Sequence, residues 1–142
     1  MKTLKSILLG LTLLVVATVA KANTYTEGEN LTKNYAISTY IDAMTHGKLK
    51  GLSEVIDQDA KFSMLRGKTV LNFSKDEMIQ SLNASKGTEQ TCTTTTSVVE
   101  SNEAIAVIKV DMQYEGFTRS NFVTVSNTGK GWKITNVYSV FK

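Results

Sequence analysis

The sequence predicts an α+β domain in which helices from its first half pack on an antiparallel sheet from its second half. Two observations predict this class. Apolar residues recur with helical spacing before Gly87 and with strand-like alternation after it. The connections between the expected strands are short, which forces neighbouring strands to run antiparallel. A chain of 142 residues has room for one such domain and its core.

The first 22 residues have the layout of an export signal. Lys2 and Lys5 precede an apolar run that ends in the small-x-small sequence Ala20-Lys21-Ala22. The run has about 14 residues, fewer than the roughly 20 that a membrane-spanning helix needs. We therefore expect residues 1–22 to be a signal peptide cut after Ala22, and residues 23–142 to form a single secreted or periplasmic domain with no membrane partner.

Charge and composition exclude several function classes. Three of the 16 basic residues lie in the expected signal, so the mature chain has 13 basic and 13 acidic residues. A neutral chain lacks the attraction that drives nucleic-acid binding, and nucleic acid is not an expected partner. One histidine and one cysteine are too few for a protein-only zinc site, so no metal and no cofactor is predicted. Cys92 is expected to be buried in a strand or to form an intermolecular bridge.

Two helices are expected at the start of the mature chain. In residues 30–46 apolar side chains recur at three- and four-residue spacing, which predicts an amphipathic helix ended by Gly47 in a left-handed cap. A shorter helix is expected over residues 50–56. Asp57 and Asp59 should end it as exposed residues.

A hairpin and a third helix follow. Residues 60–65 and 69–73 read as two strands around a tight turn at Arg66-Gly67-Lys68. Ser74-Lys75-Asp76-Glu77 is a capping box, in which the serine hydroxyl and the glutamate carboxylate each pair with a free amide at a helix start. We expect that helix to place Met78 on its apolar face.

Four strands are expected after Gly87, over residues 91–99, 104–114, 119–126 and 132–141. The second of them has the clearest pattern, since its even-numbered residues are apolar while Lys109, Asp111 and Gln113 point the other way. The apolar face should therefore be covered by the helices.

This order of elements and three stretches of local sequence resemble the nuclear transport factor 2-like superfamily. The stretches are residues 40–47 with Asp59-Ala60-Lys61-Phe62, residues 102–116, and Gly131-Trp132-Lys133-Ile134 with Tyr138. Among its exported members the branch called putative lumazine-binding is the most similar, beside polyketide-cyclase-like and ketosteroid-isomerase-like proteins. The resemblance implies a cone-shaped fold, a curved sheet, an apolar pocket between sheet and helices, and a homodimer. The lumazine label is a name given by similarity, so lumazine is not taken as an established ligand.

The resemblance also implies a test of catalysis, because the isomerase-like branch needs a tyrosine, a carboxylate base and a second carboxylic acid. Tyr40 matches the tyrosine, but Met64 and Ser120 stand where the base and the second acid are expected, and neither can shuttle a proton. We therefore expect a noncatalytic domain that binds a small apolar or aromatic molecule. Two alternatives stay open: a cyclase- or isomerase-like enzyme that uses Asp57 or Asp59, and a protein-interaction module that acts through its sheet face.

The expected pocket takes residues from the first helix and from both halves of the sheet. Its candidates are Tyr40, Phe62, Met64, Ile108, Val110, Met112, Ser120, Phe122 and Trp132. Each apolar candidate could instead fill a closed core that leaves no room for a ligand. Arg119 is expected to point away from the pocket, and His46 to complement the dipole of the first helix. Val123, Val125, Val137 and Phe141 would then form an apolar outer face through which the homodimer assembles.

Overall fold

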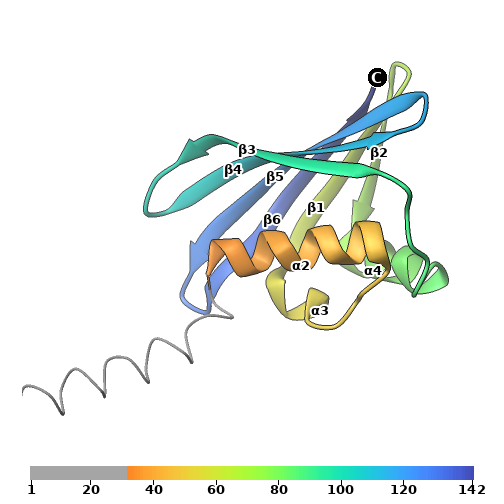
Figure 1. Cartoon of the computed structure of the whole chain (residues 1–142). Helices are drawn as coiled ribbons and strands as arrows, with labels where there is room; N and C mark the ends of the chain where they lie inside the picture. Colours follow the sequence, from red (N-terminus) through yellow and green to blue (C-terminus); the bar gives the residue numbers. More distant parts are fainter. Residues whose placement is uncertain (1–31) are drawn as a thin grey trace, which may run out of the picture. The chain divides into compact units, whose positions relative to one another are not determined.

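The computed structural model describes residues 32–142, and the expected signal peptide lies outside the described residues. Within this range three helices lie on one face of a six-stranded sheet (Figure 1). The helices are α2 (Lys33–His46), α3 (Leu52–Val55) and α4 (Lys75–Ala84). The strands are β1 (Ile56–Arg66), β2 (Thr69–Ser74), β3 (Thr93–Ser101), β4 (Ile105–Tyr114), β5 (Phe117–Thr128) and β6 (Gly131–Phe141). The predicted α+β fold is confirmed. None of the described helices is long and apolar enough to cross a membrane.

Helix α2 begins and ends at well-formed caps. The Thr32 hydroxyl accepts a hydrogen bond from the amide of Tyr35 at 3.1 Å, which satisfies a free donor in the first turn. At the other end Gly47 adopts the left-handed conformation with φ of 65°. A Cβ at Gly47 would lie 2.5 Å from the amide nitrogen of Gly87. Glycine is therefore required twice over, by its backbone angle and by this close approach.

The β1–β2 hairpin and helix α4 also form as predicted. The Ser74 hydroxyl accepts from the amide of Glu77 at 3.2 Å and donates to the Glu77 carboxylate at 3.3 Å. The cap is thus present, although the carboxylate binds the serine hydroxyl and not a backbone amide. Asp57 and Asp59 differ from expectation, because they lie within β1 and not at the end of a helix.

The sheet has the strand order β2-β1-β6-β5-β4-β3. The last four strands form the antiparallel meander that their short connections predict. The sheet as a whole is mixed, because β1 and β6 run parallel. The pairing is irregular between Ile56–Ile134 and Lys61–Asn136, where residues 57–60 of β1 lie opposite the single residue 135 of β6.

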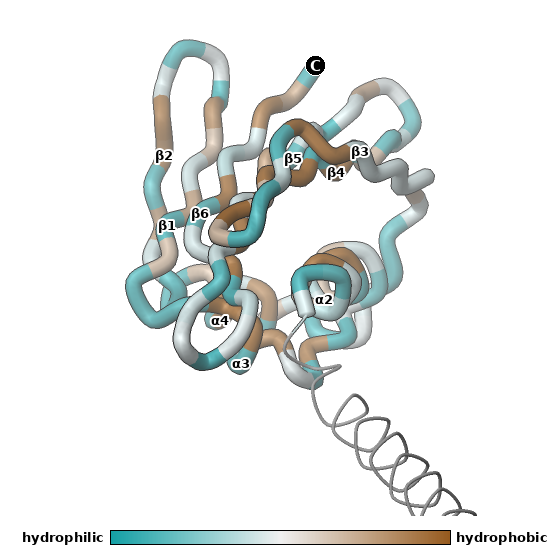
Figure 2. Tube along the Cα trace, turned by 90° about the vertical axis from the view of Figure 1, so that its left-hand side faces the viewer, coloured by the Kyte–Doolittle hydropathy of each residue, from teal (hydrophilic) through white to brown (hydrophobic). Residues whose placement is uncertain are grey.

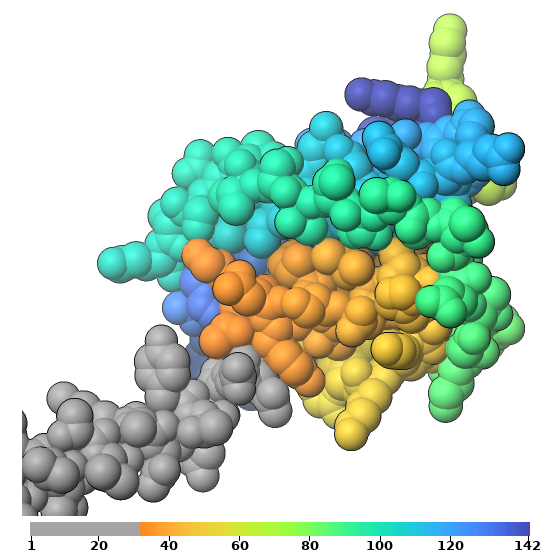
Figure 3. All heavy atoms as spheres, in the orientation of Figure 1, coloured from red at the N-terminus to blue at the C-terminus, as the bar shows by residue number. Residues whose placement is uncertain are grey.

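The core lies between the sheet and helices α2 and α3. Figure 2 shows hydrophobic residues recurring along the strands and along the helices that lie below them, and Figure 3 shows α2 across the front of the domain. Val123, Val125 and Val137 are fully buried in this core. The expectation that they form an outer apolar face was therefore wrong. Phe141 lies on the same face of the sheet as these valines. It pairs with Arg119 of β5, and Arg119 and Val123 are separated by an even number of residues along that strand, so their side chains share a face.

Candidate functional site

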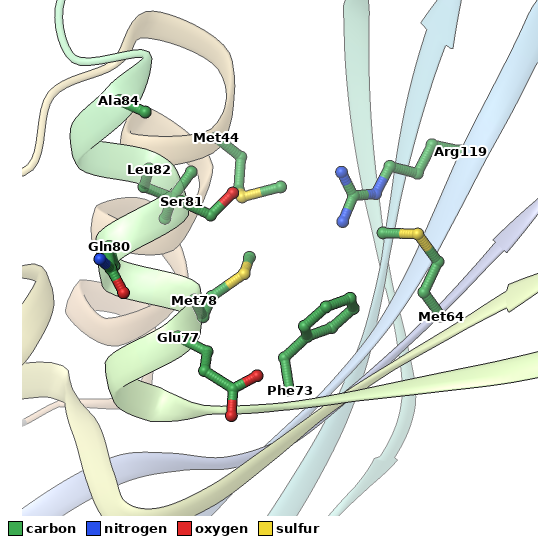
Figure 4. Close-up of a pocket in the computed structure, with 10 residues that line it drawn as sticks. All are labelled: Met44, Met64, Phe73, Glu77, Met78, Gln80, Ser81, Leu82, Ala84 and Arg119. Atoms are coloured by element: carbon green, nitrogen blue, oxygen red, sulfur yellow. The ribbon is translucent and has the colours of Figure 1, made fainter.

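A cavity of about 560 Å³ lies where helix α4 faces the sheet (Figure 4). Its walls come from the end of α2, from β1, β2 and β5, and from α4. The lining residues are Met44, Met64, Phe73, Glu77, Met78, Gln80, Ser81, Leu82, Ala84 and Arg119. A volume of this size is in the range of small-molecule sites.

The apolar part of the wall is built largely from methionine. Met44 of α2, Met64 of β1 and Met78 of α4 all line the cavity, and Figure 4 shows them reaching into the shared space from three elements. Phe73 of β2 adds an aromatic ring. Thioether side chains are flexible and polarisable, so this wall can adapt its shape to an apolar guest.

Arg119 supplies the positive charge of the cavity. It pairs with the buried Met112 across the β4–β5 ladder and so faces the helices. Its Nε donates to Oδ1 of Asn121 at 3.0 Å, and its Nη2 donates to Oγ of Ser139 at 3.3 Å. The guanidinium carbon lies 5.6 Å from the ring centroid of Phe141. These contacts hold the guanidinium in one place.

Behind Arg119 lies a buried polar network centred on Asn121, which is fully buried. Its Oδ1 also accepts hydrogen bonds from the Tyr40 hydroxyl at 3.3 Å and from Oγ of Ser139 at 2.7 Å. Its Nδ2 donates to the carbonyl of Val110 at 3.2 Å, which fixes the orientation of the amide. Burial raises the pKa of Tyr40, and the smaller opposing effect of the Arg119 charge does not reverse this. Tyr40 is therefore a neutral hydrogen-bond donor at physiological pH.

A small void of about 20 Å³ adjoins the cavity and reaches the network. Met64 and Arg119 line both spaces, whereas Phe62 and Ser139 line only the small one. The void has room for roughly one water molecule. The cavity therefore narrows toward the polar network at the sheet.

Two of the predicted pocket residues lie at these spaces, Met64 at the cavity and Phe62 at the void. Five others lie elsewhere between the helices and the sheet. Tyr40, Ile108, Val110 and Met112 are buried in the core and line neither space. Trp132 is half-buried and packs under Nζ of Lys33, 5.3 Å from its ring centroid.

Ser120 and Phe122 lie on the opposite face of the sheet. Oγ of Ser120 donates to Asp111 at 2.6 Å, and Nζ of Lys109 lies 5.9 Å from the ring centroid of Phe122. Their predicted orientation was wrong, and so was that of Arg119, which faces the helices. The cause is the pairing of β4 with β5.

The β4–β5 turn decides which residues share a face. Its two residues, Glu115 and Gly116, place Tyr114 opposite Phe117. Even-numbered residues of β4 therefore lie beside odd-numbered residues of β5, because directly opposed side chains share a face. Counting residues across this turn would have predicted, from the sequence alone, that Arg119 and Asn121 face the helices. Met44, Phe73 and Met78 carried no comparable signal, because their periodicity indicates a buried face but not a cavity.

The acidic residues of the expected enzyme alternative do not reach the cavity. The Asp57 carboxylate accepts a hydrogen bond from the amide of Asp59 at 3.0 Å, and neither residue lines the cavity. The carboxylate in its wall belongs to Glu77. His46 lies in the last turn of α2 and pairs with Glu89 at 3.0 Å. Residues 32–142 contain no cluster of histidine, cysteine and acidic side chains that could hold a metal ion.

Comparison with known proteins finds a family and a fold. The family model described as "Putative lumazine-binding" matches residues 31–139. No curated protein matches the chain.

Solved structures share the architecture at low sequence identity. A nuclear transport factor 2-like protein of unknown function from Silicibacter pomeroyi is 22% identical, with a TM-score of 0.63 over 82% of this chain and 97% of its own. A second such protein, from Shewanella baltica, is 8% identical with a TM-score of 0.63 over 83% and 95%. A protein described as a putative aromatic ring hydroxylase from Novosphingobium aromaticivorans is 16% identical, with a TM-score of 0.57 over 80% and 88%. At these identities the likeness shows the fold alone.

Proposed function

The chain belongs to the "Putative lumazine-binding" family within the nuclear transport factor 2-like superfamily, and from that premise we propose that it is an exported, noncatalytic domain that binds a small apolar or aromatic molecule. The observation that carries the proposal is the cavity beside α4. Its volume of about 560 Å³ suits a molecule of one or two rings or a medium-length chain. Its methionine-rich wall favours apolar contact without a rigid shape requirement.

The binding proposal is tested by filling the cavity from an exposed position. Ser81 lines the cavity from α4, whereas Asn83, two residues away, is exposed and does not line it. Calorimetry on the purified full chain with lumazine, naphthalene derivatives and medium-chain acids and amides should find a saturable binder. Ser81→Trp should weaken that binding at least tenfold, and the matched control Asn83→Trp should not. Absence of any binder from this set, with no molecule retained through purification, would contradict the proposal.

Export is tested by the mass of the processed protein. When the full gene is expressed in a bacterium, we expect the protein in the periplasm or medium with Asn23 as its first residue. Cytoplasmic protein that retains the first 22 residues would overturn this part of the proposal.

A cyclase- or isomerase-like enzyme is the second candidate function, and Glu77 is the observation that favours it. This carboxylate lines the cavity, where a base would be needed. Glu77→Gln keeps the contact with Ser74, since an amide oxygen can accept the hydrogen bond from the serine hydroxyl as the carboxylate does. If a bound ligand is converted by the wild type and not by Glu77→Gln, the protein is an enzyme. The noncatalytic proposal expects the same binding by both and no conversion.

We propose that the protein forms a homodimer through the sheet face turned away from the helices. That face carries half-buried apolar residues, and the register places Phe122 directly opposite Tyr138 on it. Phe122→Asp should give a monomer in analytical ultracentrifugation, while Val99→Asp, at an exposed position of the β3 edge, should not. A monomeric wild type would exclude this dimer. A dimer without any cavity ligand would favour the alternative of a protein-interaction module.

A further inference from the structure

We infer that the molecule bound in the cavity is a monocarboxylate with an apolar body, held by its carboxylate on Arg119. This inference rests on the proposed function and names the chemical class of its ligand. The charge of the cavity wall favours this class, because a purely apolar ligand would leave the positive charge of Arg119 without a partner.

Arg119 is a half-buried cation whose protein partners are all neutral. Asn121 and Ser139 accept hydrogen bonds from its Nε and Nη2. The ion pairs within residues 32–142 are His46–Glu89 and Lys109–Asp111, so Arg119 has no carboxylate partner in this range. Removing an ion from water is costly unless an opposite charge or a full set of hydrogen bonds replaces the lost hydration. An anion in the cavity would supply that replacement.

The guanidinium is held in position to receive such an anion. A guanidinium carries five N–H donors, and the contacts to Asn121 and Ser139 use two of them. No hydrogen bond from Nη1 to another residue is present within residues 32–142. Figure 4 shows the group directed from the sheet into the cavity, toward Met44 and α4. A planar carboxylate matches the remaining fork of donors in a bidentate pair.

The orientation of Arg119 depends on the network behind it. Oδ1 of Asn121 accepts from Nε of Arg119, from the Tyr40 hydroxyl and from Oγ of Ser139. Asn121 itself is oriented by its hydrogen bond to the Val110 carbonyl. Because this network is buried and neutral, it fixes the direction of the guanidinium and leaves its charge unpaired. Asn121 is therefore a positioning residue for the anion.

The rest of the cavity limits the ligand to one charge. The wall opposite Arg119 is formed by α4, and its charged residue is Glu77 (Figure 4). Glu77 would repel a second carboxylate at that end, and the methionines and Phe73 would leave a second charge unsolvated. The cavity therefore accommodates one anionic end at the sheet and an apolar body toward α4.

The experiment compares acids with amides of the same shape on the full chain. Isothermal titration calorimetry with 2-naphthoate against 2-naphthamide, and octanoate against octanamide, isolates the charge. Because hydrogen bonds to charged groups are stronger, the acid of at least one pair should bind about tenfold or more tightly than its amide. Arg119→Met should abolish this preference while amide binding persists. Arg119→Lys, which keeps the charge without the fork, should retain part of it.

Arg66→Met is the matched control, because Arg66 is exposed at the end of β1 and does not line the cavity. It should leave the preference for the acid unchanged. Equal binding of acid and amide by the wild type would overturn the carboxylate inference and leave the proposed function intact. If no acid or amide binds while lumazine or another neutral molecule does, the inference also fails alone. If nothing binds, both fail. The wild-type comparison decides the matter even if Arg119→Met does not fold.

Discussion

The space between the helices and the sheet has two regions in which the side chains pack differently. Under α2 and α3 the side chains that face the sheet are buried, and Tyr40, Leu52 and Val55 are each at most 2% exposed. Beside α4 the facing side chains, among them Met44 and Met78, stay half-buried around a cavity of about 560 Å³. We call these the closed region and the open region.

The difference shows how one layer can be both a core and a binding site. Helix α4 is anchored at its first turn, where Nζ of the buried Lys75 donates to the carbonyls of Ser53 and Ile56, each at 2.8 Å. The cavity lies beside its later residues, such as Ser81 and Leu82. Stability thus comes from the closed region and from the start of α4, which leaves the rest of α4 free to line a site.

The largest effect should come from opening the closed region. Leu52→Ala deletes a side chain that is 2% exposed, and we expect it to lower the free energy of unfolding by about 3 kcal/mol, since the neighbours cannot fully collapse into the gap. Leu82→Ala, at the existing cavity, should cost about 1 kcal/mol or less. Urea denaturation of both variants measures this. Equal losses would mean that the two regions do not differ in packing.

The next effect concerns the junction of the two regions, where the carbonyl of Gly47 accepts a hydrogen bond from Gly87 at 3.1 Å. Gly47→Ala should cost about 3 kcal/mol, because its Cβ would be strained by the backbone angle and would meet the Gly87 backbone. Gly116→Ala is the control, since it has φ of 88° but no atom within 4 Å of its Cβ. It should lose only about 1 kcal/mol. Thermal unfolding that ranked Gly116→Ala first would contradict this reading of the junction.

A smaller effect is expected at the polar network between the regions. Tyr40→Phe removes the hydroxyl that donates to Asn121, and we expect a loss of about 1 kcal/mol. The loss is modest because Arg119 and Ser139 still donate to the same oxygen. Tyr138→Phe, on the opposite sheet face, should change the free energy of unfolding by less than about 0.5 kcal/mol. A larger loss for Tyr138→Phe in the same denaturation assay would argue against a special role of the network.

The smallest effect concerns the pH dependence of stability, and it appears only in alkaline solution. Burial raises the pKa of Tyr40 above its ordinary value of 10.0. Above pH 10 the unfolded chain therefore loses the proton that the folded chain retains, and stability falls as pH rises toward the folded pKa. The wild type should lose stability above pH 10 more steeply than Tyr40→Phe. Burial also raises the pKa of Tyr114, so the variant should keep part of the slope. Parallel curves from denaturation at pH 7 to 11 would exclude the effect of Tyr40.

The sequence predicted the elements of both regions better than it predicted the site. Gly47, the Ser74 cap and the alternation in β4 are local signals, and each element that they predict is present. To predict which face each β5 side chain occupies, the residues of β5 have to be counted from the two-residue turn Glu115-Gly116. Without that step, alternation along β5 alone predicts the wrong face for Arg119.

Other parts of the structure had no local signal at all. The parallel pairing of β1 with β6 joins segments far apart in the chain. The cavity depends on the distance between α4 and the sheet. An apolar residue such as Met78 shows the same periodicity in the sequence whether it faces a core or a cavity. Helical periodicity identifies a buried face, but it carries no information on the space left in front of that face.

The place of β6 between β1 and β5 also determines the order in which the domain can assemble. The β1–β2 hairpin and the β3–β5 meander can each form early from neighbouring segments, but only β6 joins them. Since β6 is the last of the six strands along the chain, β1 keeps an unpaired edge until β6 has been made. Contacts between distant segments form slowly, so the joining of the two halves by β6 should be the late step of folding. Until β6 takes its place, the sheet of this domain can therefore exist only as two incomplete halves.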